Sequence, residues 1–169
     1  MRTLYLLRHL KSSWDEAGLP DHERPLAPRG RRAGKKLARH LRQERVAPDL
    51  VLCSTATRTR QTFEAVKAAL GDPVVRFLPE LYAASEATLL AAVRAVGPRT
   101  RSLLLIAHNP GLEDLAVGLA ARGDGEALQR LGEKFPTGAF ATLAFPGDWA
   151  ALEPGGGELV DIVVPRELG

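Results

Sequence analysis

Cysteine and long apolar runs are scarce in this sequence. The 169 residues include one cysteine, Cys53, which excludes a disulfide within the chain and is typical of proteins in a reducing cytoplasm. Because Cys53 ends the apolar run 50–53, we expect a buried core thiol rather than a reactive one. No stretch approaches the roughly eighteen consecutive apolar residues of a membrane helix, and the run 4–7 is too short for the core of a signal peptide. We therefore expect a cytoplasmic protein that does not enter a membrane.

Metal-binding patterns, internal repeats and low-complexity tracts are also missing. The four histidines and the cysteine form no C-x-x-C or H-x-x-x-H pair, the spacings typical of structural zinc. No cluster of carboxylates has the character of a Mg²⁺ site. We expect no metal and no other cofactor, and a single domain that spans residues 1–169.

The charged residues have a small basic excess. Lys and Arg number 23 and Asp and Glu number 20, which gives a formal net charge of +3 and a calculated pI near 9.3. This balance favours anionic partners, and arginine suits bidentate recognition of phosphate. Many of the cations lie on a predicted helix, 30–46, whose basic face is either a solvated surface or a nucleic-acid surface. We favour the solvated surface.

Short apolar runs alternate with helical patterns along the chain. The runs predict strands at 3–7, 50–53, 74–78, 102–107, 142–145 and 159–164. Start and stop signals predict helices at 30–46, from an N-cap at Ser54 to 70, from an N-cap at Ser85 to 96, and from Pro110 onward. We interpret 10–28 as a loop that forms one wall of the site, and 121–133 as a loop with a helical turn. The alternation predicts a three-layer α/β/α sandwich, with a mostly parallel central sheet, helices on both faces and room for antiparallel final strands.

Side chains capable of chemistry follow three of the predicted strands. Arg8 and His9 come directly after the first strand, and His108 and Asn109 directly after the fourth. Arg58 lies near the first turn of the helix that follows the second. Because the carboxyl ends of parallel strands share one edge of the sheet, we expect these side chains to meet there. Two arginines, two histidines and helix N-termini form a pocket suited to a tetrahedral, doubly negative phosphate.

An imidazole in such a pocket can act as a nucleophile. A neutral nitrogen of His9 can attack phosphorus and form a phosphohistidine that water then hydrolyses. The two arginines and a protonated His108 stabilise the charge that develops on the phosphoryl oxygens. Glu80, at another strand exit, either protonates the leaving group or is a solvated loop carboxylate. Ser12 and Asn109 are further candidates for contacts with the phosphate.

Three short motifs, in chain order, resemble the signature of the histidine phosphatase superfamily, the group that contains phosphoglycerate mutases and acid phosphatases. They are Leu-Arg-His at 7–9, a serine, an arginine and a Gln-Thr pair within 54–62, and His-Asn-Pro-Gly at 108–111. Details elsewhere are similar to the small SixA-type phosphohistidine phosphatases, at 8–14, 21–30 and 134–139.

The resemblance implies a phosphoglycerate mutase-like fold and a metal-independent phosphatase in which His9 carries the phosphoryl group. Arg8, Arg58 and His108 are then the residues that bind and polarise that group. One position departs from the pattern. Leu10 stands where the superfamily usually has glycine or alanine, and a leucine there can crowd the loop that carries the nucleophile.

The spacing between Glu80 and His108 bears on the substrate. It leaves room for one helix and one strand, and none for a lid over the pocket. An open cleft suits a phosphoryl group presented on a protein, whereas small metabolites usually need enclosure. We therefore favour phosphohistidine on a phosphorelay protein as the substrate. The alternatives are a small-molecule phosphomonoesterase and a non-catalytic module that binds phosphate or nucleic acid.

Overall fold

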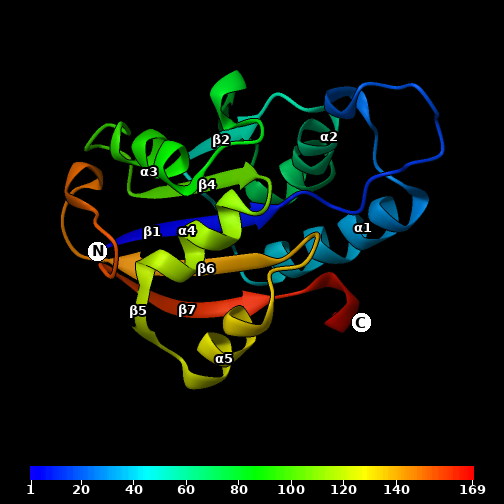
Figure 1. Cartoon of the computed structure of the whole chain (residues 1–169). Coiled ribbons are helices and arrows are strands. Elements are labelled where there is room, and N and C mark those ends of the chain that lie inside the picture. Colours follow the sequence, from blue (N-terminus) through cyan, green and yellow to red (C-terminus); the bar gives the residue numbers. More distant parts are fainter.

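The computed structural model describes residues 1–169, and its centre is one seven-stranded sheet (Figure 1). The strand order across the sheet is β3-β2-β4-β1-β6-β7-β5. The strands are Arg2–Arg8 (β1), Leu50–Ser54 (β2), Val74–Leu78 (β3), Ser102–Ala107 (β4), Ala120–Gly123 (β5), Phe140–Phe145 (β6) and Gly157–Val163 (β7). The first strand of the chain therefore lies inside the sheet, with a neighbour on each side.

Only β6 runs against the other strands. Strand β1 is parallel to β4, β2 is parallel to β3 and β4, and β5 is parallel to β7. Strand β6 is antiparallel to its neighbours β1 and β7. The predicted α/β fold with a mostly parallel sheet is confirmed. In the register of β1 and β4, Arg8 pairs with Ala107, so His9 and His108 leave the sheet at the same level.

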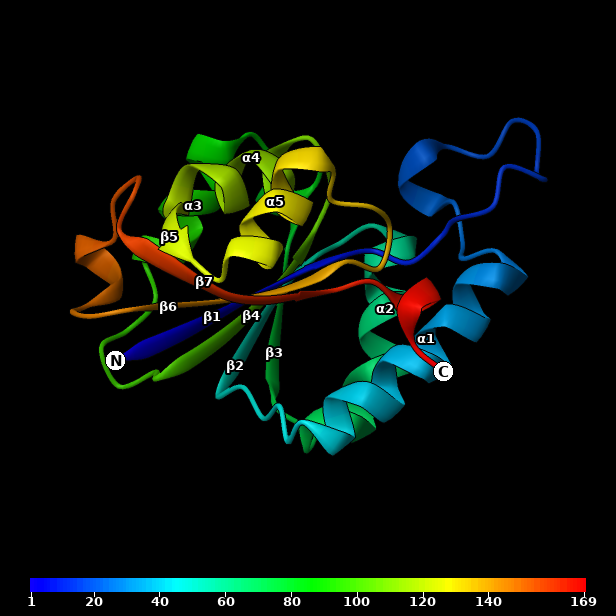
Figure 2. The same cartoon turned by 90° about the horizontal axis from the view of Figure 1, so that it is seen from below.

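Helices cover both faces of the sheet, with α1 and α2 on one face and α3, α4 and α5 on the other (Figure 2). Their bounds are Pro28–Gln43 (α1), Thr57–Val66 (α2), Glu86–Arg94 (α3), Gly111–Leu119 (α4) and Gly125–Glu133 (α5). Leu37 and Leu41 of α1 and Phe63 of α2 belong to the smaller of two buried apolar clusters, and the larger cluster lies under the other three helices. No helix combines the length and the apolar character that a membrane span requires.

Some predicted boundaries are wrong. Residues 120–123 form the edge strand β5 and residues 125–133 form α5, where we expected a loop with a helical turn. The helix expected to start from a cap at Ser54 begins at Thr57 and ends in a 3₁₀ turn, Lys67–Leu70. Ser54 is instead the last residue of β2, and no side chain caps α2.

The segment 10–28 joins β1 to α1 beyond the carboxyl ends of the parallel strands (Figure 2). It includes a 3₁₀ turn, Asp21–Glu23, and a single bridge between Ser12 and Leu26 ties its two ends together. The segment thus stands beside the strand exits where the sequence analysis expected a wall of the site.

Candidate active site

His9 is buried at the end of β1, with 7% of its surface exposed. Its Nδ1 lies 2.7 Å from the carbonyl oxygen of Leu10. A carbonyl can only accept, so Nδ1 carries the proton and donates it to this oxygen. The other ring nitrogen, Nε2, therefore holds the lone pair when the imidazole is neutral. The main chain also holds His9 in place, because its carbonyl oxygen accepts from the amide of Gly138 at 3.0 Å.

His108 lies beside His9, with the two ring centroids 5.3 Å apart. Its Nε2 is 2.8 Å from Oγ of Ser54, a fully buried side chain at the end of β2. The same Oγ accepts a hydrogen bond from the amide of Ala56, which leaves the hydroxyl proton free for Nε2. When the hydroxyl of Ser54 donates to Nε2, the ring proton of neutral His108 is on Nδ1. Nδ1 is buried and has no hydrogen-bond partner in the protein.

Both histidines are neutral at pH 7 in the field of the protein's own charges. The pKa of His9 is lowered to about 4, chiefly by burial and further by the nearby guanidinium groups, against the opposing effect of the bond to Leu10. Burial also lowers the pKa of His108 to about 3, with contributions from His9 and Arg58. The sequence analysis assumed a protonated His108, a state that these surroundings disfavour until a dianion binds nearby.

Arg58 lies in the first turn of α2, where the sequence predicted it. Its guanidinium donates to Asp21, with Nη1 2.8 Å from the main-chain oxygen and Nη2 3.0 Å from Oδ2. Arg60, two residues along the helix, is directed elsewhere, because its guanidinium lies over the ring of Phe77 and donates to the main-chain oxygen of Thr55. The loop and the helix are thus joined through a buried arginine.

The carboxylate of Asp21 connects three side chains at the edge of the site. Oδ1 accepts from Arg24 at 2.9 Å, and Oδ2 accepts from the hydroxyl of Tyr82 at 2.5 Å as well as from Arg58. The bond from Tyr82 and those from the two arginines hold the pKa of Asp21 well below its usual range. Arg24 also donates to Oγ of Ser12 at 2.5 Å, so Ser12 is tied into the same network.

Arg8 and Asn109 meet at the main-chain oxygen of Phe135. Nη1 of Arg8 donates to it at 3.2 Å and Nδ2 of Asn109 at 2.8 Å. Nε of Arg8 and Oδ1 of Asn109 are buried and have no hydrogen-bond partner in the protein. Arg8 is thereby fixed through one end of its guanidinium while a second donor remains unused.

Glu80 is not brought into contact with either histidine. It lies in the 3₁₀ turn Pro79–Leu81, its side chain is exposed, and it makes no hydrogen bond or ion pair. It lines a cavity of about 350 Å³ together with residues of β3 and α3. Tyr82 is the residue of this turn that reaches the candidate site, because its ring packs edge-on against His108 at 5.5 Å.

Leu10 is fully buried. Its two methyl groups lie against two glycines. A Cβ on Gly34 of α1 would come within 2.9 Å of Cδ1, and a Cβ on Gly138 would come within 3.1 Å of Cδ2. The space that a leucine needs at this position is therefore supplied by two positions that lack side chains. The main-chain oxygen of Leu10 stays free to hold His9.

The site contains residues to which the sequence analysis assigned no role, chiefly Asp21, Tyr82 and Arg24. Asp21 and Arg24 lie in the 10–28 loop, and their charge in a segment expected to border the site was the available signal. Nothing in the sequence marks Tyr82. No group of three or more His, Cys, Asp and Glu side chains is arranged to hold a metal ion.

Taken together, these residues place two guanidinium groups near a neutral, oriented imidazole. The guanidinium groups of Arg8 and Arg58 carry the positive charge. Nε of Arg8 and Nδ1 of His108 are buried and have no hydrogen-bond partner in the protein. Such an arrangement can bind a phosphoryl group and expose its phosphorus to a nucleophile.

Comparisons with known proteins agree with this geometry. The family model described as "Histidine phosphatase superfamily (branch 1)" matches residues 4–82 of this chain. An uncharacterized protein of Mycobacterium tuberculosis is 41% identical over 95% of this chain and 100% of its own length. The chain belongs to the histidine phosphatase superfamily.

Within the superfamily, this chain is similar to solved structures of proteins named SixA. One from Nakamurella multipartitia is 35% identical, covers 97% of this chain and 96% of its own, and superposes with a TM-score of 0.83. Another from Agrobacterium tumefaciens is 30% identical, with 97% and 98% covered and a TM-score of 0.83. The resemblance inferred from the short motifs is confirmed, and the chain is a phosphatase-type domain of this group.

Proposed function

We propose that this protein is a metal-independent phosphatase that removes phosphoryl groups from phosphohistidine on proteins, through a covalent intermediate on His9. The observation that carries the proposal is the hydrogen bond from Nδ1 of His9 to the carbonyl of Leu10. It keeps the proton on one nitrogen and directs the lone pair to Nε2. Burial and the low pKa of His9 maintain that nucleophilic form at neutral pH.

In the first step Nε2 of His9 attacks phosphorus and the bond between phosphorus and the leaving nitrogen breaks. The electron pair goes to that nitrogen, and a substrate imidazole protonated on its other nitrogen leaves neutral. Arg8, Arg58 and the Nδ1 donor of His108 stabilise the charge on the phosphoryl oxygens. The bound dianion also favours protonation of His108.

In the second step water attacks phosphorus and the Nε2–P bond breaks. His9 regains its lone pair and keeps the proton on Nδ1 throughout. Phosphate leaves and one proton of the water passes to solvent. A P–N substrate needs no protein acid in either step, which is consistent with a carboxylate-poor pocket.

The fold around the site supports a protein substrate. Between the turn that holds Glu80 and His108 the chain forms only α3 and β4, and neither is an added layer over the pocket. The 10–28 segment borders the site on one side. An open site accepts a phosphoryl group that projects from a protein surface, whereas a small phosphoester gains little enclosure there.

The test compares phosphate release from a histidine-phosphotransfer domain phosphorylated on histidine with release from p-nitrophenyl phosphate and phosphoglycerate, with EDTA present. We expect the wild type to act on the phosphoprotein and His9→Ala to be inactive. Rapid acid-free quenching of the wild type should trap phosphate on the protein in an alkali-stable, acid-labile form, typical of phosphohistidine.

Two results would redirect the proposal. Turnover confined to the small esters would make the protein a small-molecule phosphomonoesterase on the same scaffold. Activity that EDTA removes and Mg²⁺ restores would contradict the metal-independent mechanism. A melting curve for His9→Ala separates loss of chemistry from loss of fold.

A further inference from the structure

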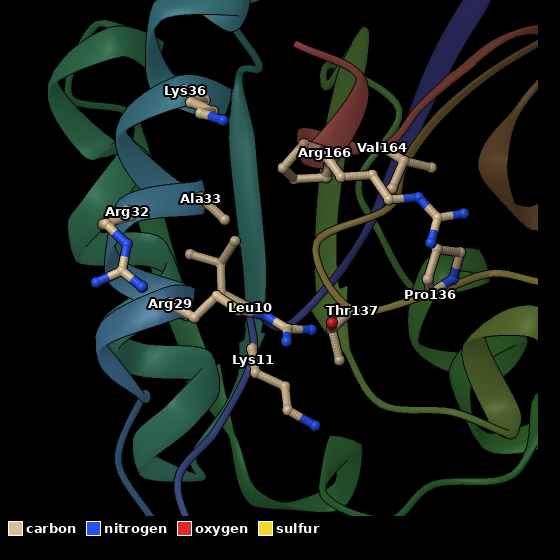
Figure 3. A pocket seen from close by; sticks show the side chains of 11 residues that line it. Leu10, Lys11, Arg29, Arg32, Ala33, Lys36, Pro136, Thr137, Val164 and Arg166 are labelled. Atoms are coloured by element: carbon tan, nitrogen blue, oxygen red, sulfur yellow. The ribbon is translucent and has the colours of Figure 1, made fainter. Parts of the chain in front are cut away.

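A second cavity, of about 380 Å³, lies between α1, the 135–138 loop and the C-terminal segment (Figure 3). Figure 3 shows α1 on one side and Val164 and Arg166 on the other. The cavity is lined by Leu10, Lys11, Arg29, Arg32, Ala33, Lys36, Pro136, Thr137, Val164, Pro165 and Arg166. The lining includes none of the residues expected to hold the phosphoryl group, which are Arg8, His9, Arg58 and His108.

The charges of this cavity all have one sign. Five of the eleven lining residues are cations, and none is an aspartate or glutamate. Their side chains make no ion pair and no hydrogen bond within the protein, whereas Arg2, Arg24, Arg58 and Arg130 each have a carboxylate partner. Five unpaired cations around one hollow repel one another, and an anion bound among them removes that repulsion.

The spacing of the cations sets the size of the anion. Arg29, Arg32 and Lys36 lie on one side of α1 over two turns, a rise of about 10 Å at 1.5 Å per residue. Arg166 and Lys11 come from other segments and complete the ring. A single phosphate contacts one part of such a ring. A chain of linked phosphoryl groups spans it.

We propose that this cavity binds a small polyphosphorylated anion, with two or more linked phosphoryl groups. Its volume falls in the range of small-molecule sites. The site is next to the catalytic loop without being part of the candidate active site. Lys11 lies two residues after His9, and its main-chain oxygen accepts from the amide of Ala27 at the start of α1, so an occupant contacts the segment that positions the nucleophile.

The other cations of α1 distinguish this proposal from a nucleic-acid surface. Arg31 and Lys35 line a different hollow, which they share with Glu64, and Arg39 donates to the main-chain oxygen of Gly169. Arg29, Arg32 and Lys36 are thus the cations of α1 that line a cavity with no carboxylate in its lining. A nucleic acid would use the cations around the whole helix.

The experiment measures binding of inorganic tripolyphosphate, pyrophosphate and orthophosphate by isothermal titration calorimetry. The wild type is compared with Arg32→Ala/Lys36→Ala, and Arg31→Ala/Lys35→Ala is the matched control on the same helix. Arg58→Ala is included because it weakens anion binding at the candidate active site. Circular dichroism and melting curves verify that each variant is folded.

We expect tripolyphosphate to bind the wild type at least about tenfold more tightly than orthophosphate. The Arg32/Lys36 pair should lower that affinity about tenfold or more, since two of the five cations that line the cavity are removed. The Arg31/Lys35 pair should change it less than about threefold, and Arg58→Ala should leave it intact.

Three results overturn the inference. Equal losses in the two double variants indicate diffuse attraction to α1. Loss in Arg58→Ala alone assigns the ligand to the active site. Tighter binding of a single-stranded oligonucleotide, sensitive to both pairs, indicates a nucleic-acid surface. Because binding is measured without turnover, the outcome is independent of the proposed phosphatase activity.

Discussion

Oδ2 of Asp21 lies 3.0 Å from the guanidinium of Arg58, and this pair fixes the arginine that the proposed reaction uses. The same carboxylate holds Arg24 and Tyr82. A carboxylate in a phosphate site has two opposing effects. It orients the guanidinium groups, and it offsets the positive charge that attracts the substrate.

Asp21→Asn separates these two effects. We expect kcat on the phosphoprotein to fall roughly ten- to a hundredfold, because Arg58 loses its orientation. The inhibition constant of inorganic phosphate should fall, since the pocket gains one unit of positive charge. Asp15→Asn is the control, because Asp15 lies in the same loop and has no ion pair. Equal effects of the two substitutions would contradict a specific role for Asp21.

Gly34→Ala tests whether Leu10 depends on a neighbour without a side chain. The new Cβ would lie 2.9 Å from Cδ1 of Leu10 and 3.1 Å from Cβ of Ala65. We expect the free energy of unfolding to fall by about 1–3 kcal/mol, in spite of the better helix propensity of alanine. Gly132→Ala in α5 is the control, because a Cβ there meets nothing within 4 Å, and it should stabilise by up to about 1 kcal/mol.

The Leu10→Ala/Gly34→Ala pair completes a double-mutant cycle. Removing the leucine methyl groups makes room for the alanine, so the two substitutions together should cost less than the sum of the two alone. Strict additivity, measured by urea unfolding, would mean that the two side chains do not compete for space.

The buried histidines predict how stability varies with pH. An unfolded histidine binds a proton near its ordinary pKa of 6.5, whereas the folded pKa values of His9 and His108 are about 4 and about 3. Between these values the unfolded chain binds more protons, so the free energy of unfolding falls as the pH drops from about 6.5 toward 4. For His9 the loss is on the order of 3 kcal/mol.

Urea unfolding of the wild type and of His9→Gln at pH 7, 6 and 5 measures this contribution. The wild type should lose more stability on acidification than the variant. If the free energy of unfolding fell equally with pH in the wild type and in the variant, the pKa of His9 would be the same in the folded and unfolded chain. The contribution of Asp21 belongs to a lower pH range, because its pKa is depressed and its stabilisation is lost only below about 4.

Glu80→Gln tests the proton-donor hypothesis. The exposed side chain of Glu80 makes no hydrogen bond to His9 or His108, so we expect activity on the phosphoprotein to change less than about threefold. Tyr82→Phe removes the hydroxyl that binds Asp21 and should have the larger effect. A hundredfold loss in Glu80→Gln, together with loss of the basic limb of the pH–rate profile, would make Glu80 the acid.

Much of the sheet and the candidate site could be predicted because both follow from the strands. Arg8, His9 and His108 come directly after buried apolar runs, and parallel pairing of those runs brings the side chains together. Arg58 follows from its distance to the end of β2. Such local patterns reflect which side chains are buried, and the order of apolar and polar residues in the sequence indicates this.

The rest depends on contacts between distant segments. Asp21 is an ordinary loop carboxylate until the fold brings Arg58 and Tyr82 to it. The fit of Leu10 depends on Gly34 and Gly138, which lie far from it in sequence. Strand β5 has only four residues, Ala120–Gly123, at the edge of the sheet, and so short an edge strand has no alternating pattern to mark it.

The interior position of β1 has a consequence for synthesis. Strand β1 leaves the ribosome before its partners β4 and β6, whose residues follow it by about a hundred and a hundred and forty positions (Thr3 with Ser102, Arg2 with Phe145). Until those partners emerge, Arg8 and His9 belong to an unpaired apolar segment. A nascent fragment that stops short of β6 therefore lacks the complete sheet around β1, and His9 reaches its final surroundings long after it is synthesised.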